Sequence, residues 1–392
     1  MERFELESWL RLALSPGVGN GGGRRLMAAF GLPDNVFRQS PASLRQLVTP
    51  AQVAALQSPP PELPTVLETT WAWLVAAEGP ARRAVVVLGD PAYPASLLAM
   101  EDPPLLLYVL GRTDLWHANT AARSLAMVGS RNPTPQGELS ARDLARGCAQ
   151  AGLTVVSGLA LGIDSAAHHG ALDGAAASPA QLATIAVVGT GLDRVYPKRN
   201  LALAHRIAAQ GLLLSEYHLG TPPLPANFPK RNRLIAGLSL GTLVVEAALQ
   251  SGSLITARLA SEQGKEVFAV PGSIHSMQSR GCHALIKQGA KLVESLQDVL
   301  DEIQAIMGPS GASGKVASSS VADSSDELPD EDEDEEDEPL LTSMGYDPVS
   351  LDALVARTGI SAAMLQVRLL ELELDNQVAR LAGGLFQRTV AT

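Results

Sequence analysis

The stretch that decides the fold is residues 154–172, TVVSGLALGIDSAAHHGAL. Thr154–Val156 is a short apolar run, typical of a parallel strand that is buried on both faces. A glycine-rich turn follows, and Asp164–Leu172 has a helical pattern. A buried strand, a glycine turn and a helix form the repeating unit of a doubly wound α/β sheet.

The same unit repeats on both sides of this stretch. We therefore predict an α/β domain over residues 80–306: an extended Rossmann-like fold with a doubly wound, mostly parallel sheet. The other predicted strands are Val85–Leu88, Leu105–Val109, Leu125–Val128, Ile185–Val188, Leu212–Leu214, Thr242–Glu246, Val267–Val270 and Lys291–Val293. The other predicted helices are Gln136–Gln150, Asn200–Ala209, Arg233–Leu238, Leu254–Gln263 and His283–Gln288, several of which end in glycine, a common C-terminal stop.

Three further segments flank this domain. Residues 1–75 carry short helical patterns around a glycine-rich turn, which indicates a small helical domain similar to SAM-like or helix-hairpin-helix modules. Residues 308–339 are rich in Gly and Ser and then almost purely acidic, so we expect a disordered linker. Residues 340–392 show two helical patterns and a hairpin, which favours a winged-helix-like domain.

The composition indicates a folded chain with a basic middle. Hydrophobic residues make up 46% of the 392 residues, enough for a sizeable core, and aromatics only 4%. The formal net charge is −11, but twelve of the 41 acids lie within residues 323–338, and the other 29 face 30 Lys and Arg. Residues 121–292 carry 16 Lys and Arg against 9 acids. This pattern is compatible with a polyanionic partner beside an acidic tether.

Several protein classes are disfavoured. Cys148 and Cys282 lie far apart with no CxxC or Cys/His spacing, so we expect neither a disulfide scaffold nor a metal site. The N-terminus is too charged for a signal peptide and no apolar run of about 18 residues occurs, so we expect a cytoplasmic protein without a membrane span. No GxxxxGK[ST] or HExxH pattern occurs, which argues against a P-loop ATPase and against hydrolases of the HExxH type. We expect no cofactor.

Candidate binding residues follow the predicted strands, because ligands of open α/β sheets bind outside the carboxyl ends of the strands. Glycines there let an anion approach the backbone, while hydroxyls, helix N-termini and cations donate to phosphate oxygens. Several such turns, with a basic loop over residues 228–233, favour an extended phosphate backbone over one mononucleotide. The predicted binding residues are Gly129, Ser130, Arg131, Ser157, Gly158, Lys198, Arg199, Asn200, Phe228, Lys230, Arg231, Asn232, Arg233, Ser251, Gly252 and Ser253.

Acids and histidines near these turns receive structural interpretations. Glu216 and Glu246 end or follow strands, and we expect them to cap or to form salt bridges rather than to catalyse. His168 and its neighbour His169 point about 100° apart on a helix, so we expect a hydrogen-bonded role rather than metal ligation. We expect Asp164 to cap its helix.

Seven motifs then point to one family. They are Val128-Gly129-Ser130-Arg131, residues 157–168 (SGLALGIDSAAH), 189–197 (GTGLDRVYP), 228–239 (FPKRNRLIAGLS), 251–257 (SGSLITA), 270–272 (VPG) and 285–293 (LIKQGAKLV). In this order they resemble the DNA-processing protein A family (DprA, also Smf). His283 stands where an Asn is frequent in that family, and the acidic tether is not a family requirement.

The resemblance implies a function. It implies that the protein binds and protects single-stranded DNA, forms a homodimer, and loads RecA recombinase onto incoming strands during natural transformation, without catalytic turnover. The basic residues have few aromatic neighbours, among them Phe228, Tyr196 and Tyr217. We therefore expect phosphate contacts to dominate, with at most one or two stacked bases.

Two alternatives remain beside this interpretation. A nucleotide-processing Rossmann hydrolase, similar to the lysine-decarboxylase-like phosphoribohydrolases, needs a PGGxGTxxE loop. The nearest segment, residues 237–246 (GLSLGTLVVE), lacks the leading Pro-Gly-Gly and places its Glu one residue late. An NAD-type binder is disfavoured because no predicted strand is followed by GxGxxG.

The charge of the C-terminal domain bears on its partner. Residues 340–392 hold four Arg against five acids, whereas a helix that enters a DNA groove normally presents a basic face. We therefore expect this domain to contact protein or itself rather than duplex DNA.

Overall fold

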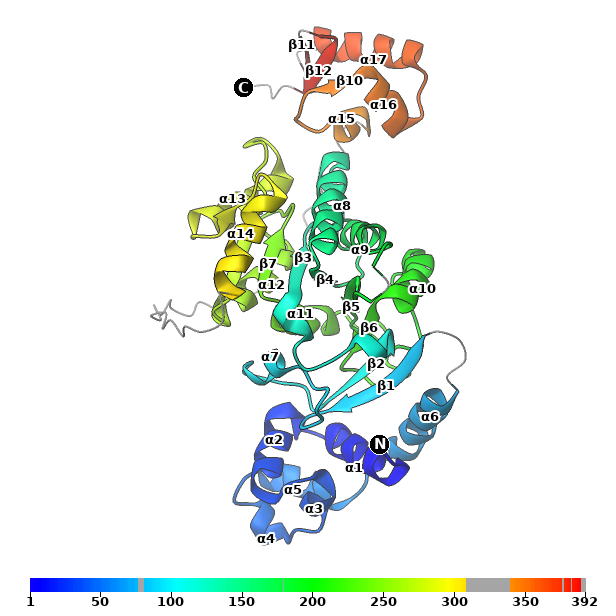
Figure 1. The fold of residues 1–392 in the computed structure, drawn as a ribbon, viewed down its shortest axis with the longest axis vertical. Coiled ribbons are helices and arrows are strands. Elements are labelled where there is room, and N and C mark those ends of the chain that lie inside the picture. The colour runs from blue at the N-terminus through cyan, green and yellow to red at the C-terminus, as the bar shows by residue number, and fades with distance from the viewer. Residues whose placement is uncertain (77–80, 179, 308–338, 376, 382, 389–392) are drawn as a thin grey trace. The chain divides into compact units, whose positions relative to one another are not determined.

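The computed structural model describes residues 1–76, 81–178, 180–307, 339–375, 377–381 and 383–388. The chain divides into two compact units, residues 1–296 and residues 297–392. A nine-stranded sheet lies in the first unit and a three-stranded sheet in the second (Figure 1).

The large sheet has the strand order β1-β2-β6-β5-β4-β3-β7-β8-β9. The neighbours from β6 to β9 pair in parallel, whereas β1 pairs with β2, and β2 with β6, in antiparallel fashion. The chain changes direction across the sheet between β3 and β7, which is a topological switch point. The predicted mostly parallel, Rossmann-like sheet is confirmed. The strands are β1 (Arg82–Val87), β2 (Leu106–Gly111), β3 (Ser124–Val128), β4 (Thr154–Ser157), β5 (Thr184–Val187), β6 (Leu212–Ser215), β7 (Gly241–Val244), β8 (Glu266–Ala269) and β9 (Lys291–Leu292).

Helices flank the sheet on both faces (Figure 1). Helices α8 and α9 pack against β3 and β4, and α9 also contacts β5. Helix α10 packs against β2, β5 and β6. Leu234 of α11, Ala257 of α12 and Cys282 of α13 join a core that also contains Val128 and Val187. The helices of this region are α7 (Ala95–Leu98), η1 (Thr113–Leu115), η2 (Thr120–Arg123), α8 (Pro135–Gln150), α9 (Ile163–Gly174), η3 (Lys198–Asn200), α10 (Leu201–Gln210), α11 (Asn227–Gly237), α12 (Gly252–Glu262), η4 (Met277–Ser279) and α13 (Arg280–Lys287).

The predicted basic loop is the first part of a helix. Helix α11 begins at Asn227, well before the expected start at Arg233. Pro229 is tolerated there because the first amide groups of a helix have no partner within the helix. The buried residues Asn227, Arg231 and Leu234 follow the helical period, so this segment has an inner and an outer face.

Six helices within residues 1–76 share one hydrophobic core with β1 and β2. Val85 and Tyr108 share a core with Leu6 and Leu10 of these helices, whereas Val86, from the same strand β1, belongs to the main core. The predicted helical segment is present, but it lies in one compact unit with the sheet, and the boundary expected near residue 75 stays a prediction. The helices are α1 (Arg3–Leu14), α2 (Gly19–Phe30), α3 (Pro33–Phe37), α4 (Pro41–Leu44), α5 (Pro50–Gln57) and α6 (Leu63–Val75).

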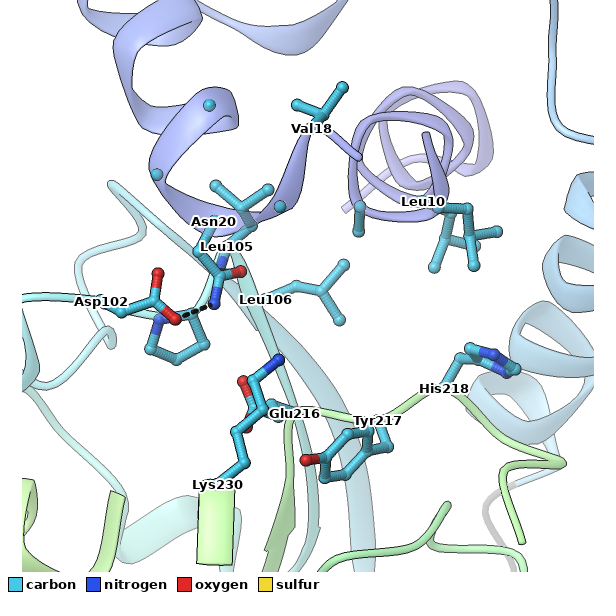
Figure 2. A pocket seen from close by; sticks show the side chains of 16 residues that line it. Leu10, Val18, Asn20, Asp102, Leu105, Leu106, Glu216, Tyr217, His218 and Lys230 are labelled. Carbon is cyan, nitrogen blue, oxygen red and sulfur yellow. Dashed lines mark hydrogen bonds between the residues drawn. The ribbon is translucent and has the colours of Figure 1, made fainter. Parts of the chain in front are cut away.

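A cleft of about 470 Å³ opens where these helices meet the sheet (Figure 2). Side chains of α1 and α2 form one wall, and residues next to β2, β6 and α11 form the other.

The second unit has the two predicted helices and the predicted hairpin. Leu354, Leu365 and Phe386 lie in its core. The predicted linker falls outside the described residues, apart from Pro339. The elements are α14 (Leu296–Met307), α15 (Pro339–Met344), β10 (Val349–Ser350), α16 (Leu351–Thr358), α17 (Ala362–Leu374), β11 (Val378–Leu381) and β12 (Leu385–Arg388). Within the described ranges no single helix is long and apolar enough to cross a membrane; the bent pair α16 and α17 passes together, by length and composition only.

Candidate nucleic-acid interface

Three predicted turns lie side by side at the carboxyl edge of the sheet. They follow β3, β4 and β5, which are parallel neighbours or next-neighbours, so their ends meet at one edge. The Ile163 amide donates to the Ser130 carbonyl at 3.1 Å, which joins the β3 turn to the start of α9. The Ser130 amide donates to the Glu246 carbonyl at 2.7 Å, which joins the same turn to the residues after β7.

Helix α11 connects these turns to one another. The Asn227 side-chain amide donates to the Gly189 carbonyl after β5 at 3.0 Å. Arg231 donates to the Gly158 carbonyl after β4 at 2.6 Å. Asn232 donates to the Gly252 carbonyl at the start of α12 at 3.4 Å. These contacts hold α11 against the carboxyl ends of the strands, so the outer face of α11 borders the predicted binding region.

The turn between β4 and α9 is held in an unusual backbone conformation. Leu159 has φ of 59°, which residues with a side chain rarely adopt. The Asp164 carboxylate accepts from the amides of Gly158 at 3.1 Å and Ala160 at 3.3 Å. The Asn200 amide donates to the Leu159 carbonyl at 2.9 Å, so η3 is fixed over the turn.

Asp164 therefore does not cap α9 as expected. The N-cap position is Gly162, and the Asp164 carboxylate turns back to order residues 158–160. Burial raises the pKa of Asp164, while the nearby charge of Arg231 and the two amide donors counteract that effect.

Arg231 lies inside the protein, not on the predicted interface. It is 4% exposed and donates to the carbonyls of Gly158 and Val187. Burial, together with the positive charge of the neighbouring Arg131, lowers the pKa of Arg231 to about 10, although the nearby Asp164 carboxylate acts in the opposite direction. The helical spacing explains the difference, because position 231 falls on the same face as Leu234.

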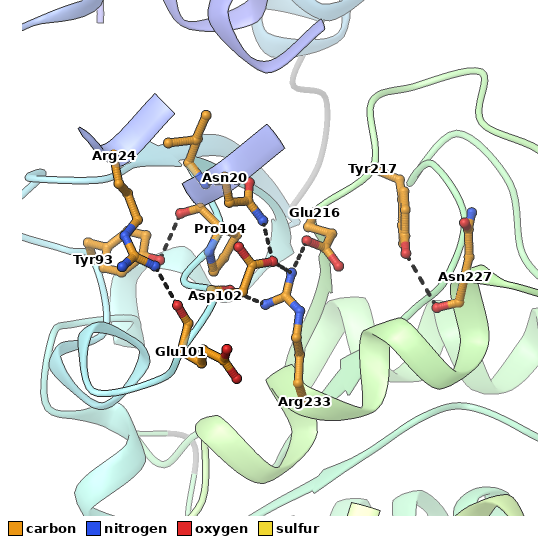
Figure 3. Close-up of polar contacts among 11 residues, drawn as sticks. Asn20, Arg24, Tyr93, Glu101, Asp102, Pro104, Glu216, Tyr217, Asn227 and Arg233 are labelled. Carbon is orange, nitrogen blue, oxygen red and sulfur yellow. Dashed lines mark hydrogen bonds and ion pairs between the residues drawn. The ribbon is translucent and has the colours of Figure 1, made fainter. Parts of the chain in front are cut away.

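Arg233 is also held by internal partners. It pairs with Glu216 and donates to the Asp102 carbonyl at 2.7 Å, and its guanidinium lies 3.6 Å from the Asp102 carboxylate (Figure 3). Its side chain is only 11% exposed. The expected salt-bridge role of Glu216 is confirmed. Arg233 is held beside Asp102, which in turn accepts from Asn20 of α2, and it does not project toward the predicted DNA-binding edge.

The predicted hydroxyl groups also point inward. Ser157 donates to the Met127 carbonyl at 2.6 Å, and the Ser130 hydroxyl accepts from the Asn132 amide at 3.1 Å. Ser251 caps α12 by accepting from the Ser253 amide at 3.3 Å. These groups build the turns, so they are less open to a phosphate than the sequence suggested.

The start of α8 is likewise occupied. Thr134 caps it by accepting from the Gly137 amide at 3.0 Å. The Glu246 carboxylate accepts from the Thr134 amide at 2.9 Å and from the Thr134 hydroxyl at 2.6 Å. The expected capping role of Glu246 is confirmed, and an anion at this helix end would meet a carboxylate already in place.

Four predicted cations do project into solvent. Arg131 follows the β3 turn, Lys198 and Arg199 lie on η3, and Lys230 lies on α11. All four residues are exposed, and none makes a hydrogen bond or ion pair with another residue of the described ranges. Side-chain charge, rather than helix termini, is what this edge offers to an anion.

An aromatic pair lies beside these cations. The rings of Tyr196 and Phe228 are 5.5 Å apart at their centroids, and Tyr196 is 49% exposed. Phe228 contacts Gly189, where an added Cβ would lie 3.2 Å from the ring. Gly189 thus makes room for the ring at the β5 turn.

The paired histidines take structural positions. The His168 Nδ1 lies 2.7 Å from the Thr184 hydroxyl, which confirms the expected hydrogen-bonded role, and burial lowers the pKa of His168 to about 3. His169 contacts Arg206 at 2.9 Å. In the part of the chain that the structure describes, no group of three or more His, Cys, Asp or Glu is arranged to hold a metal.

One contributor to this edge, Asn227, was not predicted from the sequence, and another, Asp164, was expected there only as a helix cap. Asn227 and Asp164 fix the turns through buried hydrogen bonds. A helical reading that began at Asn227 would have placed Asn227 and Arg231 on the apolar face, which is the signal that was available.

Comparison with known proteins agrees with this geometry. Residues 84–304 match the family model described as DNA recombination-mediator protein A, and residues 324–384 match the DprA winged helix domain. Protein Smf of Escherichia coli strain K12 is 42% identical over 294 residues, which is 74% of this chain and 74% of that protein. DNA processing protein DprA of Streptococcus pneumoniae is 48% identical over 215 residues, which is 55% of this chain and 72% of that protein.

A solved structure extends the likeness to the fold. The X-ray structure of DprA from Streptococcus pneumoniae aligns with a TM-score of 0.63 at 36% identity, over 78% of this chain and 99% of that chain. The family model spans more than half of the residues, and the sequence relatives are matched over most of their length. The chain therefore belongs to the DNA recombination-mediator protein A family, whose members are named DprA or Smf.

Proposed function

We propose that this protein binds single-stranded DNA along the carboxyl edge of its large sheet. The observation that carries the proposal is a set of four exposed cations that form no hydrogen bond or ion pair within the described residues: Arg131, Lys198, Arg199 and Lys230. Fixed positive charges spread over several neighbouring turns suit a chain of phosphates. Membership of a family of DNA recombination mediators supports a nucleic-acid ligand.

The aromatic pair favours a single strand over a duplex. Tyr196 presents an open ring next to Phe228, and unstacked bases bind such rings whatever their identity. Bases inside a duplex are already stacked on each other. Phosphate contacts and stacking carry little sequence information, so binding is expected to be largely independent of sequence.

We extend the proposal to a mediator role. As a homodimer in the cytoplasm, the protein protects incoming strands and loads RecA recombinase onto them during natural transformation, and it acts by binding without catalytic turnover. Adding the protein is expected to speed RecA assembly on a strand covered by single-strand-binding protein, measured as RecA ATP hydrolysis. Unchanged RecA assembly would contradict the mediator role and leave DNA binding intact.

A fluorescence-anisotropy titration tests the binding proposal directly. A labelled oligothymidine and a matching blunt duplex are titrated at several salt concentrations. The single strand is expected to bind more tightly, and four phosphate contacts give a slope of log affinity against log salt of about −3. Equal affinity for the duplex, or affinity that salt does not change, would overturn the proposal.

A further inference from the structure

Helix α17, which lies along one side of the second unit, is apolar on two opposite faces (Figure 1). Its inner residues Leu365, Leu369 and Leu372 are at most 3% exposed and belong to the core of that unit. Because successive residues of a helix are about 100° apart, positions 364, 367, 370 and 374 lie on the opposite side. These four form the outer face of α17, and their exposed fractions are 68% for Met364, 61% for Val367, 56% for Leu370 and 74% for Leu374.

Duplex DNA does not account for this outer face. In a helix-turn-helix the second helix enters the DNA groove, and α17 has that position because it follows α16 after a bend of 110°. The one cation within α17 is Arg368, and it forms an ion pair with Glu371 of the same helix at 2.5 Å. Phosphates and base edges give four large aliphatic side chains little to pack against.

The spacing of the exposed apolar residues points to another helix as the cover. Four exposed positions of α17 are separated by four, three and four residues: Ala363, Val367, Leu370 and Leu374. That alternation is the seam along which one helix packs on another, with the side chains of each in the gaps of the other. Single apolar residues are common on a protein surface, whereas a continuous apolar stripe marks an interaction site.

The charges beside the outer face favour a second copy of the same helix. In an antiparallel pair with a two-fold axis between Val367 and Leu370, the Val367 of each copy lies against the Leu370 of the other. Arg368 of each copy then lies beside Glu371 of the other, so opposite charges meet across the axis as well as within each helix. Residues 340–392 hold four Arg against five acids, so two copies bring little net charge together.

We propose that the winged-helix domains of two copies of this chain pair through the outer faces of their α17 helices, in antiparallel orientation. This contact needs two copies and no DNA, so it does not rest on the proposed DNA binding. It assigns a surface to self-association, which the proposed homodimer leaves open. The winged-helix domain then serves the assembly of the protein and not the reading of a DNA groove.

Cross-linking through an introduced thiol tests whether two outer faces meet. Cys148 and Cys282 are the two cysteines of the sequence, and both are fully buried, so Val367→Cys supplies the one accessible thiol. The full chain is treated with a short bis-maleimide, and the covalent dimer is quantified on a denaturing gel. Val367→Cys is expected to form the covalent dimer readily. Ala356→Cys, at an exposed position of α16, should form much less at the same protein concentration.

A charge placed within the seam tests whether the apolar contact drives the association. Leu370→Glu is expected to weaken self-association by about tenfold or more, because pairing would bury a carboxylate without a partner. Leu370 is 56% exposed, so the domain should still fold, which circular dichroism checks. Gln366→Glu adds the same charge at an exposed position of α17 outside the outer face, and it should associate like the unaltered protein.

A charge exchange tests the antiparallel arrangement. Arg368→Glu is expected to weaken association, because it places two carboxylates side by side across the axis. The double variant Arg368→Glu with Glu371→Arg should restore association. The ion pair is exposed on both sides and contributes little to folding, so thermal unfolding should stay the same in all three proteins. Association that Arg368→Glu leaves unchanged would overturn the antiparallel pairing.

Sedimentation velocity of the full chain separates this contact from pairing through another surface. If a second surface also pairs two chains, the unaltered protein is expected to form species larger than a dimer, and Leu370→Glu should reduce them to the dimer. If α17 is the one contact, Leu370→Glu should convert dimers to monomers. In both cases Gln366→Glu keeps the mass distribution of the unaltered protein.

Two results would overturn the α17 contact. One is a yield of covalent dimer from Val367→Cys that is no higher than from Ala356→Cys, whether a single-ended maleimide finds the thiol open or covered by another part of the same chain. The other is a mass distribution that Leu370→Glu leaves unchanged. Failure of the proposed DNA binding shows elsewhere, in the anisotropy titration, and these measurements contain no DNA.

Discussion

Arg131 and Arg231 carry the same charged group in opposite surroundings. Arg131 is exposed at the β3 turn, so Arg131→Ala should remove one phosphate contact without loss of stability. Single-strand affinity is expected to fall, and the slope of log affinity against log salt to flatten by up to about one unit. Arg45→Ala, an exposed position in the N-terminal helices, removes the same charge and serves as the control. An unchanged slope in Arg131→Ala would take Arg131 out of the interface.

Arg231→Ala should act on the fold instead. The change removes the donor of two buried carbonyls, Gly158 and Val187, and leaves the Asp164 carboxylate without its offsetting charge. Because a buried carboxylate loses its compensating charge, the free energy of unfolding, measured in urea, is expected to fall by about 3–5 kcal/mol. If stability stays at the level of the unaltered protein while the salt slope flattens, Arg231 is a phosphate ligand after all.

His168 predicts a dependence of stability on pH. Its pKa falls from 6.5 to about 3 on folding, because burial disfavours the charged imidazole. The unfolded chain therefore binds the proton first, and this contribution to stability is complete above pH 6.5 and lost as the pH falls toward about 3. The loss is up to about 1.4 kcal/mol per pH unit.

Urea unfolding at pH 7.5 and pH 5 tests this. His168→Asn keeps a partner for Thr184, should be less stable at pH 7.5, and should lose less on acidification than the unaltered protein. The exposed His205→Asn on α10 should leave the acid loss as it is. An equal acid loss in His168→Asn would contradict the assignment.

At the scale of elements, the turn before α9 lies against the turn that follows β3, and both belong to the proposed DNA-binding edge. Gly162 has φ of 74°, and an added Cβ would collide with the backbone carbonyls of Ser130 and Arg131. Gly162→Ala should therefore lower the unfolding free energy by about 2 kcal/mol or more and weaken single-strand binding, because both turns must shift.

Gly264 gives a matched comparison for this prediction. It has φ of 68° at the end of α12, with open space where a Cβ would lie. Gly264→Ala should lower the free energy of unfolding by only about 1 kcal/mol, because the added side chain strains the left-handed backbone but meets no neighbour. Its DNA affinity should be unchanged. Equal effects of the two substitutions would mean that contact with the β3 turn does not matter.

The elements also show how far the sequence leads. All nine strands of the large sheet were predictable, because each contains a short apolar run, and the central strands are buried along their whole length. Helix α11 was predictable only in its second half, since Pro229 and the basic residues of its first turns look like a loop. The hydrogen bonds from Asn227 and Arg231 to distant carbonyls depend on the strand order, which no local pattern encodes.

At the scale of the whole molecule, charge is distributed unevenly along the chain. Residues 323–338 carry twelve acids, whereas residues 121–292 have a net charge of +7. Deleting residues 323–338 should tighten single-strand binding at low salt, because a tethered polyanion competes with DNA for the same cations. Raising the salt should shrink the difference. Equal affinity with and without the segment in anisotropy titrations would exclude this competition.

Strands β1 and β2 serve two hydrophobic cores at once. Val85 and Tyr108 face the N-terminal helices, while Val86 and Val109 face the main core. The helices and the sheet are therefore expected to melt in a single cooperative transition rather than one after the other. A truncated protein that starts near residue 80 would expose the apolar face that β1 and β2 turn toward the N-terminal helices. Such a fragment should therefore associate or precipitate instead of behaving as an independent Rossmann-like domain.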